Sequence, residues 1–111
     1  MKEYKHFIKL LLDENGTIIE FECSLREMKY NETEVLGKNW FNTFIDEGDR
    51  EAALKVFHSL LNDKNENTKV FTSDIQCKEK NHKLINFENK LIIKDGKKYV
   101  LVYGVEHMDK V

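Results

Sequence analysis

Residues 7–22 read FIKLLLDENGTIIEFE, and this pattern predicts the first two elements of the fold. Two runs rich in apolar and β-branched residues, 7–12 and 17–22, flank a turn that contains Asn15 and Gly16. Asn-Gly between two such runs is a strong hairpin signal, because both residues tolerate positive φ angles. The sequence therefore predicts two antiparallel strands joined by a tight turn.

The next part of the chain predicts short helices. Asn31 and Glu34 have the spacing of a capping box, which predicts about one helical turn at 32–36. Gly37 follows directly, as expected for a left-handed helix end. The preceding residues, 25–30, could form another helical turn.

The longest helix is expected from about Asp49 to Asn62, after an aromatic stretch at 39–45 that is expected to be helical at its end. The apolar residues of this long helix fall within one half of its circumference, as in a helix that packs on a core. They are Ala52, Ala53, Val56, Phe57, Leu60 and Leu61. The side chains expected on the opposite, solvent-facing side are Arg50, Lys55, Ser59 and Asn62.

Three further strands are predicted at 70–77, 83–93 and 98–105, with a charged turn at 78–81 and an Asp-Gly turn at 95–96. Apolar and polar residues alternate in the second of these runs, as in a sheet with one covered face. The order of elements predicts an α+β fold, with a five-stranded antiparallel sheet and helices packed on one face.

The composition fits one compact domain spanning residues 1–111. The chain is 41% hydrophobic and contains seven Phe, four Tyr and one Trp, which is enough for a core. Eighteen basic and twenty acidic residues give a formal net charge of −2, so we expect no nucleic-acid partner. No apolar run has the length of a membrane span or a signal peptide, and we expect no membrane insertion of this segment.

Two cysteines, Cys23 and Cys77, are too few for a disulfide framework or a zinc site. They fit the reduced thiols of a cytoplasmic protein. A redox role would require an exposed thiolate with a low pKa, and Cys77 does lie next to Lys78. The structural interpretation is favoured, because cysteine is often buried and both residues lie in or beside predicted strands.

The sequence offers no catalytic constellation. Of the four histidines, His6, His58, His82 and His107, none is spaced from another His or Cys like a metal ligand. The glycines are isolated rather than gathered in a phosphate-binding loop. A nucleophile needs a base beside it in space, and nothing in the sequence nominates such a pair. We therefore expect the domain itself not to be an enzyme and to hold no metal.

Four landmarks resemble a known family. They are LDENGTI at 12–18, NETEVLGKNWF at 31–41, Asp49-Arg50 at the start of the long helix, and Gly104 near the end of the last strand. In this order they are similar to a PAS domain, the sensor fold of bacterial signalling proteins, over roughly residues 7–107. The resemblance implies the spatial strand order 2-1-5-4-3 and a small cavity between the long helix and the sheet. The family often ends on Gly-x-Asp-Ile-Thr, where this chain has Glu106 in the place of the Asp.

The resemblance also implies a function. A PAS domain of this kind would be a sensory or regulatory input domain, which binds a small ligand or partner and relays the signal to an output domain. A histidine kinase or a diguanylate cyclase would be a typical output domain, and we expect the chain to be a fragment of such a larger signalling protein. A homodimer is expected. The alternative is a dimerisation or protein-interaction module with a filled core, which makes contacts through residues 1–8 and the exposed sheet face.

The cofactors of related sensors are not expected here. In PAS domains that carry haem, the ligand histidine falls near Ala53 of this chain, and His58 is expected to face solvent. In light-sensing relatives, a cysteine that bonds to flavin stands where this chain has Trp40. We therefore predict neither haem nor flavin, and an unidentified small molecule remains open.

The remaining candidate site is a set of aromatic residues around the implied cavity, with one polar residue among them. The candidates are Trp40, Phe41, Phe44, Phe57, Phe71, Phe87 and Tyr103, together with Asn89. Such a set could form an apolar ligand pocket with a polar group that orients the ligand. It could equally be a filled core, since a small domain needs large aromatic side chains for its stability.

Overall fold

The computed structural model describes residues 7–24, 28–62, 68–79 and 81–106. Its elements are β1 (Phe7–Leu12), β2 (Ile18–Cys23), α1 (Glu32–Val35), α2 (Trp40–Thr43), α3 (Glu47–Leu61), β3 (Lys69–Gln76), β4 (His82–Lys94) and β5 (Lys97–Glu106). Residues 25–27 of the helical turn considered at 25–30 lie outside the described residues, as do the histidines His6 and His107.

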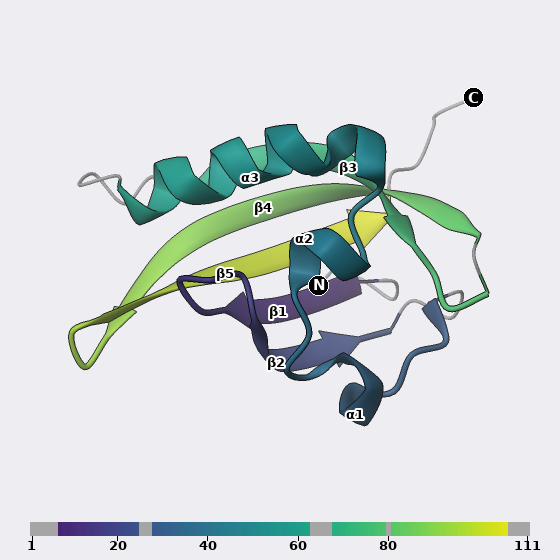
Figure 1. Ribbon diagram of the computed structural model, residues 1–111, viewed down its shortest axis with the longest axis horizontal. Coiled ribbons are helices and arrows are strands. Elements are labelled where there is room, and N and C mark those ends of the chain that lie inside the picture. The colour runs from purple at the N-terminus through teal and green to yellow at the C-terminus, as the bar shows by residue number, and fades with distance from the viewer. Residues whose placement is uncertain (1–6, 25–27, 63–67, 80, 107–111) are drawn as a thin grey trace, which may run out of the picture.

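The five strands form one antiparallel sheet in the order β2-β1-β5-β4-β3, which confirms the predicted fold class and strand order. The helices lie on one face of this sheet (Figure 1). Helix α3 packs against β3, β4 and β5, whereas α1 contacts β2 and α2 contacts α3. The first strand and the last strand are therefore neighbours in the middle of the sheet, and the long helix covers the half formed by the last three strands.

The β1–β2 hairpin forms as predicted, but its turn is not the expected Asn-Gly type. Gly16 alone takes a positive φ, of 83°, whereas Asn15 does not. The turn is instead held by the Asp13 carboxylate, which accepts hydrogen bonds from the backbone amides of Asn15 and Thr17, both at 2.9 Å. Two successive left-handed residues occur in the β4–β5 hairpin, where Asp95 and Gly96 have φ values of 53° and 76°.

Helix α1 carries the predicted capping box. The backbone amide of Asn31 donates to the carboxylate of Glu34 at 3.1 Å, and Gly37 takes the left-handed conformation with φ 85°. Helix α2 is a single turn, capped by Asn39, whose side-chain oxygen accepts from the amide of Asn42 at 3.0 Å. Side-chain caps thus compensate for the small number of hydrogen bonds inside such short helices.

Helix α3 begins two residues before Asp49, because the side chain of Asp46 caps it by accepting from the amide of Gly48 at 3.1 Å. Of the predicted apolar face, Ala53, Phe57 and Leu60 are buried, Val56 and Leu61 are half-buried, and Ala52 is exposed.

The prediction that Arg50 faces solvent is wrong. Its guanidinium group is half-buried and donates to the backbone oxygens of Phe41, at 2.9 Å, and Ile45, at 3.3 Å. These carbonyl groups lie around the end of α2, so the arginine side chain folds back across the first turn of α3 instead of extending into solvent. The other residues predicted on that side, Lys55, Ser59 and Asn62, are exposed.

Gly104 in β5 is required by packing. A Cβ atom there would lie 2.6 Å from the side chain of Ile85 and 2.7 Å from the ring of Phe87. Because Phe87 is paired with Gly104 across the β4–β5 ladder, its ring occupies the space that a side chain would need. The landmark glycine of the last strand therefore allows a large aromatic residue to lie flat on the covered face.

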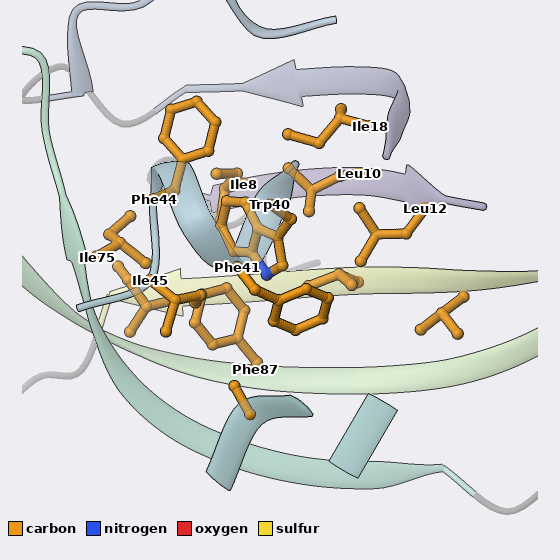
Figure 2. Packing of buried hydrophobic residues seen from close by; sticks show 14 of the residues in the cluster. Ile8, Leu10, Leu12, Ile18, Trp40, Phe41, Phe44, Ile45, Ile75 and Phe87 are labelled. Atoms are coloured by element: carbon orange, nitrogen blue, oxygen red, sulfur yellow. The ribbon is translucent and has the colours of Figure 1, made fainter. Parts of the chain in front are cut away.

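The core lies between the helices and the sheet. Figure 2 shows part of it, with side chains from β1, α2 and β4 gathered around Trp40. The Trp40 ring contacts Phe44 on one side, with ring centres 5.5 Å apart, and Phe87 on another, at 5.8 Å. Trp40 thus connects the part of the core next to α1 and α2 with the part beneath α3.

Candidate functional site

A cavity lies between α3 and the sheet. Its volume is about 20 Å³, which is room for about one water molecule. Six of the eight predicted site residues line it: Trp40, Phe41, Phe57, Phe71, Phe87 and Asn89. The prediction therefore named all five aromatic residues that line this cavity, although their role in binding remains a prediction.

Two of the predicted residues do not line the cavity. Phe44 is fully buried beyond Trp40, where its ring packs edge to face against Tyr30 at 5.1 Å. Tyr103 lies on the opposite face of the sheet and stacks on Phe7, with ring centres 5.8 Å apart. Strand alternation explains this position, since Val102 on the same strand faces the helices.

The sequence interpretation missed the aliphatic part of the lining. Helix α3 contributes Ala53, Val56 and Leu60, while Leu12, Ile45, Val100 and Val102 complete the wall. The helical periodicity of the long helix and the alternation along β5 were the signals that could have found them.

Trp40 is positioned by the β1–β2 hairpin. The backbone amide of Trp40 donates to the oxygen of Gly16 at 2.9 Å, and the side-chain amide of Asn39 donates to the oxygen of Asn15 at 3.1 Å. A side chain at Gly16 would lie 2.9 Å from the ring of Phe41. Hydrogen bonds therefore fix the start of α2 against the hairpin turn, and Trp40 and Phe41 are directed into the core.

The indole N–H of Trp40 is buried and has no hydrogen-bond partner among the described residues. The side chain is only 3% exposed, and no described residue accepts a hydrogen bond from its nitrogen. Figure 2 shows this nitrogen on the side of the ring that faces Phe41 and Phe87, both of which line the cavity. A buried polar group of this kind needs an explanation, because most are paired with protein or water.

Asn89 is the polar residue of the lining. It is 9% exposed, and its side-chain NH₂ donates to the backbone oxygen of Lys69 at 3.2 Å. The side-chain oxygen accepts from no group in the described part of the chain. The lining therefore contains a free donor on Trp40 and a free acceptor on Asn89, among side chains that carry no charge.

Hydrogen bonds hold both ends of α3 in place. At its start, the Asp49 carboxylate accepts from the hydroxyl of Ser73, at 3.0 Å, and from the amide of Asp74, at 3.1 Å. At its end, the Lys98 ammonium group donates to the oxygen of Leu61 at 2.7 Å. The middle of the helix, which covers the cavity, contacts the sheet through apolar side chains.

The other residues considered from the sequence are His58, Ala53 and the two cysteines. His58 is exposed, as expected, and Ala53 is buried against the cavity. Cys77 is buried, with its sulfur 3.8 Å from that of Met28, and Cys23 is half-buried. Within the described ranges, no three His, Cys, Asp or Glu side chains gather as a metal site would require, and no helix is long and apolar enough to cross a membrane.

Similar folds occur among solved structures. The PAS domain of the RpfR quorum-sensing receptor of Cronobacter turicensis, in complex with BDSF, is 21% identical, with a TM-score of 0.72 over 97% of this chain and 99% of that one. The Drosophila melanogaster Cycle PAS-B domain with bound ethylene glycol is 13% identical, with a TM-score of 0.75 over 91% of this chain and 99% of that one. This chain has the PAS fold.

A PAS domain from a two-component sensor histidine kinase is also similar to this chain, at 16% identity and a TM-score of 0.70, over 91% of this chain and 85% of that one. No protein-family model matches the sequence. No curated protein matches it either. At these identities the likeness concerns the fold, and the function has to be argued from the cavity.

Proposed function

We propose that this PAS domain is a sensory input domain, which binds a small ligand between α3 and the sheet and relays its presence to an output domain. The observation that carries this proposal is the cavity itself, with an apolar wall and two unpaired polar groups. The similar PAS domain of RpfR was solved with BDSF and with C12:0, and that of Cycle with ethylene glycol. These ligands belong to those proteins, and they support a ligand in the corresponding region here.

Strand β5 is the proposed path for the signal. It contributes Val100 and Val102 to the cavity and runs on to Glu106, whose carboxylate pairs with the Lys83 ammonium group at 2.9 Å. A ligand that pushes α3 away from the sheet would change the packing of this strand, and the change would reach Glu106 as a shift between two arrangements. In this proposal the domain performs no catalysis, and it acts in the cytoplasm as part of a longer protein with a histidine kinase or diguanylate cyclase as its output.

Native mass spectrometry of the purified protein tests the sensor role. We expect a retained small molecule, which is lost in Ala53→Leu, where the new side chain fills the cavity, and kept in Ala52→Leu. Ala52 is the matched control because it is the neighbouring residue on the exposed side of the same helix. Hydrogen exchange should also slow in α3 and β5 when the ligand is present. A protein that retains nothing, and whose exchange in β5 responds to no compound of a metabolite library, would contradict the proposal.

A dimerisation module is the second candidate, and the outer face of the sheet favours it. Val70 is 74% exposed and Leu84 is 41% exposed on this face. With Tyr103 and Val105, Val70 lines a groove there with a volume of about 430 Å³. Sedimentation of the native protein should then show a homodimer that Val70→Lys dissociates. A tight dimer without a retained molecule would favour this module over the sensor.

A further inference from the structure

The two unpaired polar groups of the cavity define which ligand would fit it. The indole of Trp40 offers one hydrogen and accepts none, and the side-chain oxygen of Asn89 accepts and cannot donate. Leaving both unpaired in an apolar surrounding is costly, since a buried polar group without a partner loses its hydration. An occupant that satisfies both must therefore accept one hydrogen bond and donate another.

The orientation of the Asn89 side chain follows from its neighbour. The group bonded at 3.2 Å is the backbone oxygen of Lys69, which can only accept. The NH₂ group of Asn89 must therefore lie on that side, and the carbonyl oxygen of the side chain on the other. The acceptor character of the free atom thus does not depend on how an amide is assigned.

The edge-to-face contact between Trp40 and Phe87 does not replace a hydrogen bond. Their ring planes make an angle of 84° with centres 5.8 Å apart, so the indole edge can contact a π face. Such contacts are weak compared with a hydrogen bond to oxygen. The indole N–H therefore still favours an oxygen acceptor in the cavity.

We propose that this cavity recognises the hydroxyl group of a small neutral alcohol. The hydroxyl oxygen accepts from the Trp40 indole, and the hydroxyl hydrogen goes to the side-chain oxygen of Asn89, while the alkyl part lies against Phe57, Val56 and Phe71. This inference rests on the proposed function and names the chemical class of its ligand. In this proposal a water molecule makes the same two bonds in the ligand-free protein, so the alcohol replaces it without leaving either group unpaired.

The absence of charge in the lining excludes ionic ligands. None of the described side chains that line the cavity is ionisable, so a buried carboxylate or ammonium group would find no partner of opposite charge among them. An ether or a hydrocarbon would leave the Asn89 oxygen unpaired. The alcohol is therefore favoured over each of these compounds for a separate reason.

The ligand must enter where the wall is least covered. Val56 on α3 and Phe71 on β3 are the half-buried residues among the described lining, and these two elements pack against each other. The cavity of about 20 Å³ must widen to admit an alkyl chain. Because hydrogen bonds hold α3 at its ends rather than in its middle, apolar side chains between Val56 and Phe71 can move apart without breaking one.

The test uses the native protein and three probes of similar size: 1-butanol, its isomer 1-methoxypropane, and butyrate at neutral pH. Trp40 is the only tryptophan, so its indole N–H gives a single resonance in a ¹⁵N-correlated NMR spectrum. We expect 1-butanol to shift this resonance saturably and to bind about tenfold more tightly than the ether, with butyrate weaker than both.

Two variants distinguish recognition of the hydroxyl group from burial of the alkyl chain alone. Asn89→Leu should remove the preference for the alcohol over the ether, because the acceptor is gone while the apolar wall remains. Asn86→Leu, on the same strand and outside the cavity lining, should retain the preference. If Asn89→Leu fails to fold, the comparison of alcohol and ether on the native protein still decides the inference.

The outcomes distinguish this inference from the proposed function. Equal binding of alcohol and ether, tighter binding of butyrate, or no shift with any probe would overturn the recognition of a hydroxyl group. The sensor role would then still be tested by native mass spectrometry, through the retained molecule and its loss in Ala53→Leu.

Discussion

The covered face of the sheet has two halves that differ in how completely they are filled. Next to α1 and α2, the core residues Ile8, Leu10, Ile18, Val35 and Phe44 are each at most 1% exposed. Beneath α3, the same face contains a cavity and two buried polar groups that have no partners in the described part of the chain. The difference suggests a division of roles, in which one half supplies most of the packing stability and the other is kept open for a ligand.

Trp40 lies at the boundary between the two halves. Its ring packs on Phe44 in the filled half and on Phe87 in the half beneath α3. A change in the cavity therefore reaches a residue that is tied through its backbone to the β1–β2 hairpin. Variants in each half test whether the two halves respond separately.

Phe44→Ala should have the largest effect, because it removes a fully buried ring from the filled half. We expect the free energy of unfolding to fall by about 3–5 kcal/mol, as measured by urea denaturation. The matched control is Phe7→Ala, which removes a half-buried ring stacked on Tyr103 on the outer face and should lose about 1–2 kcal/mol. Equal losses for the two variants would show that the filled half is not the main source of stability.

Asp49→Ala should loosen the cavity half alone. It removes the acceptor for Ser73 and for the amide of Asp74, and we expect a loss of about 1.5–3 kcal/mol. Amide hydrogen exchange should become faster in α3 and in β3, and should stay unchanged in β1 and β2. Glu51→Ala, an exposed acidic residue of the same helix, is the control and should change neither property. Faster exchange throughout the sheet would mean that the halves are not independent.

Adding one methylene group should change the stability by different amounts in the two halves. Val35→Ile overfills the packed half and should lower the free energy of unfolding by about 1–3 kcal/mol. Val100→Ile places the same group at the cavity, where there is room for it, and should change stability by less than about 1 kcal/mol. Thermal denaturation of the two variants makes the comparison. A large loss for Val100→Ile would indicate that the cavity half is as tightly packed as the other.

The smallest effect concerns Glu34 at the edge of the filled half. The Lys78 ammonium group pairs with it and holds the pKa of its carboxyl group below the ordinary value of 4.5. A lowered pKa in the folded state contributes stability above pH 4.5, which is lost as the pH falls through the folded-state pKa. Urea midpoints measured between neutral and acidic pH should show this decline, and Glu34→Gln should reduce it. An identical pH profile for the variant would exclude Glu34 as its source.

Much of the fold could be predicted from the sequence, because its signals are local. Alternation, capping pairs and turn residues lie within a few positions of one another, and they place all five strands and α3. The turn of the first hairpin was less predictable, since the Asp13 side chain competes with the expected Asn-Gly geometry. The strand order came from a resemblance to PAS domains, because pairing between distant strands is not visible in the residues of either one.

The candidate site was predictable only in part. Its aromatic lining could be named from residue type, but Phe44 and Tyr103 were misplaced, because their positions depend on the docking of α2 and on the register of β5. The decisive feature, an indole N–H and an amide oxygen without partners, cannot be read from a sequence. It depends on every side chain around Trp40 and Asn89, and therefore on the complete packing of the core.

A high-resolution crystal structure of the purified protein would show what occupies the cavity between Trp40 and Asn89. We expect ordered density in the cavity, from a water molecule or a retained alcohol, within hydrogen-bond distance of both the Trp40 nitrogen and the Asn89 side-chain oxygen. An empty cavity, or side chains packed so that these two groups bond directly to protein, would contradict the account.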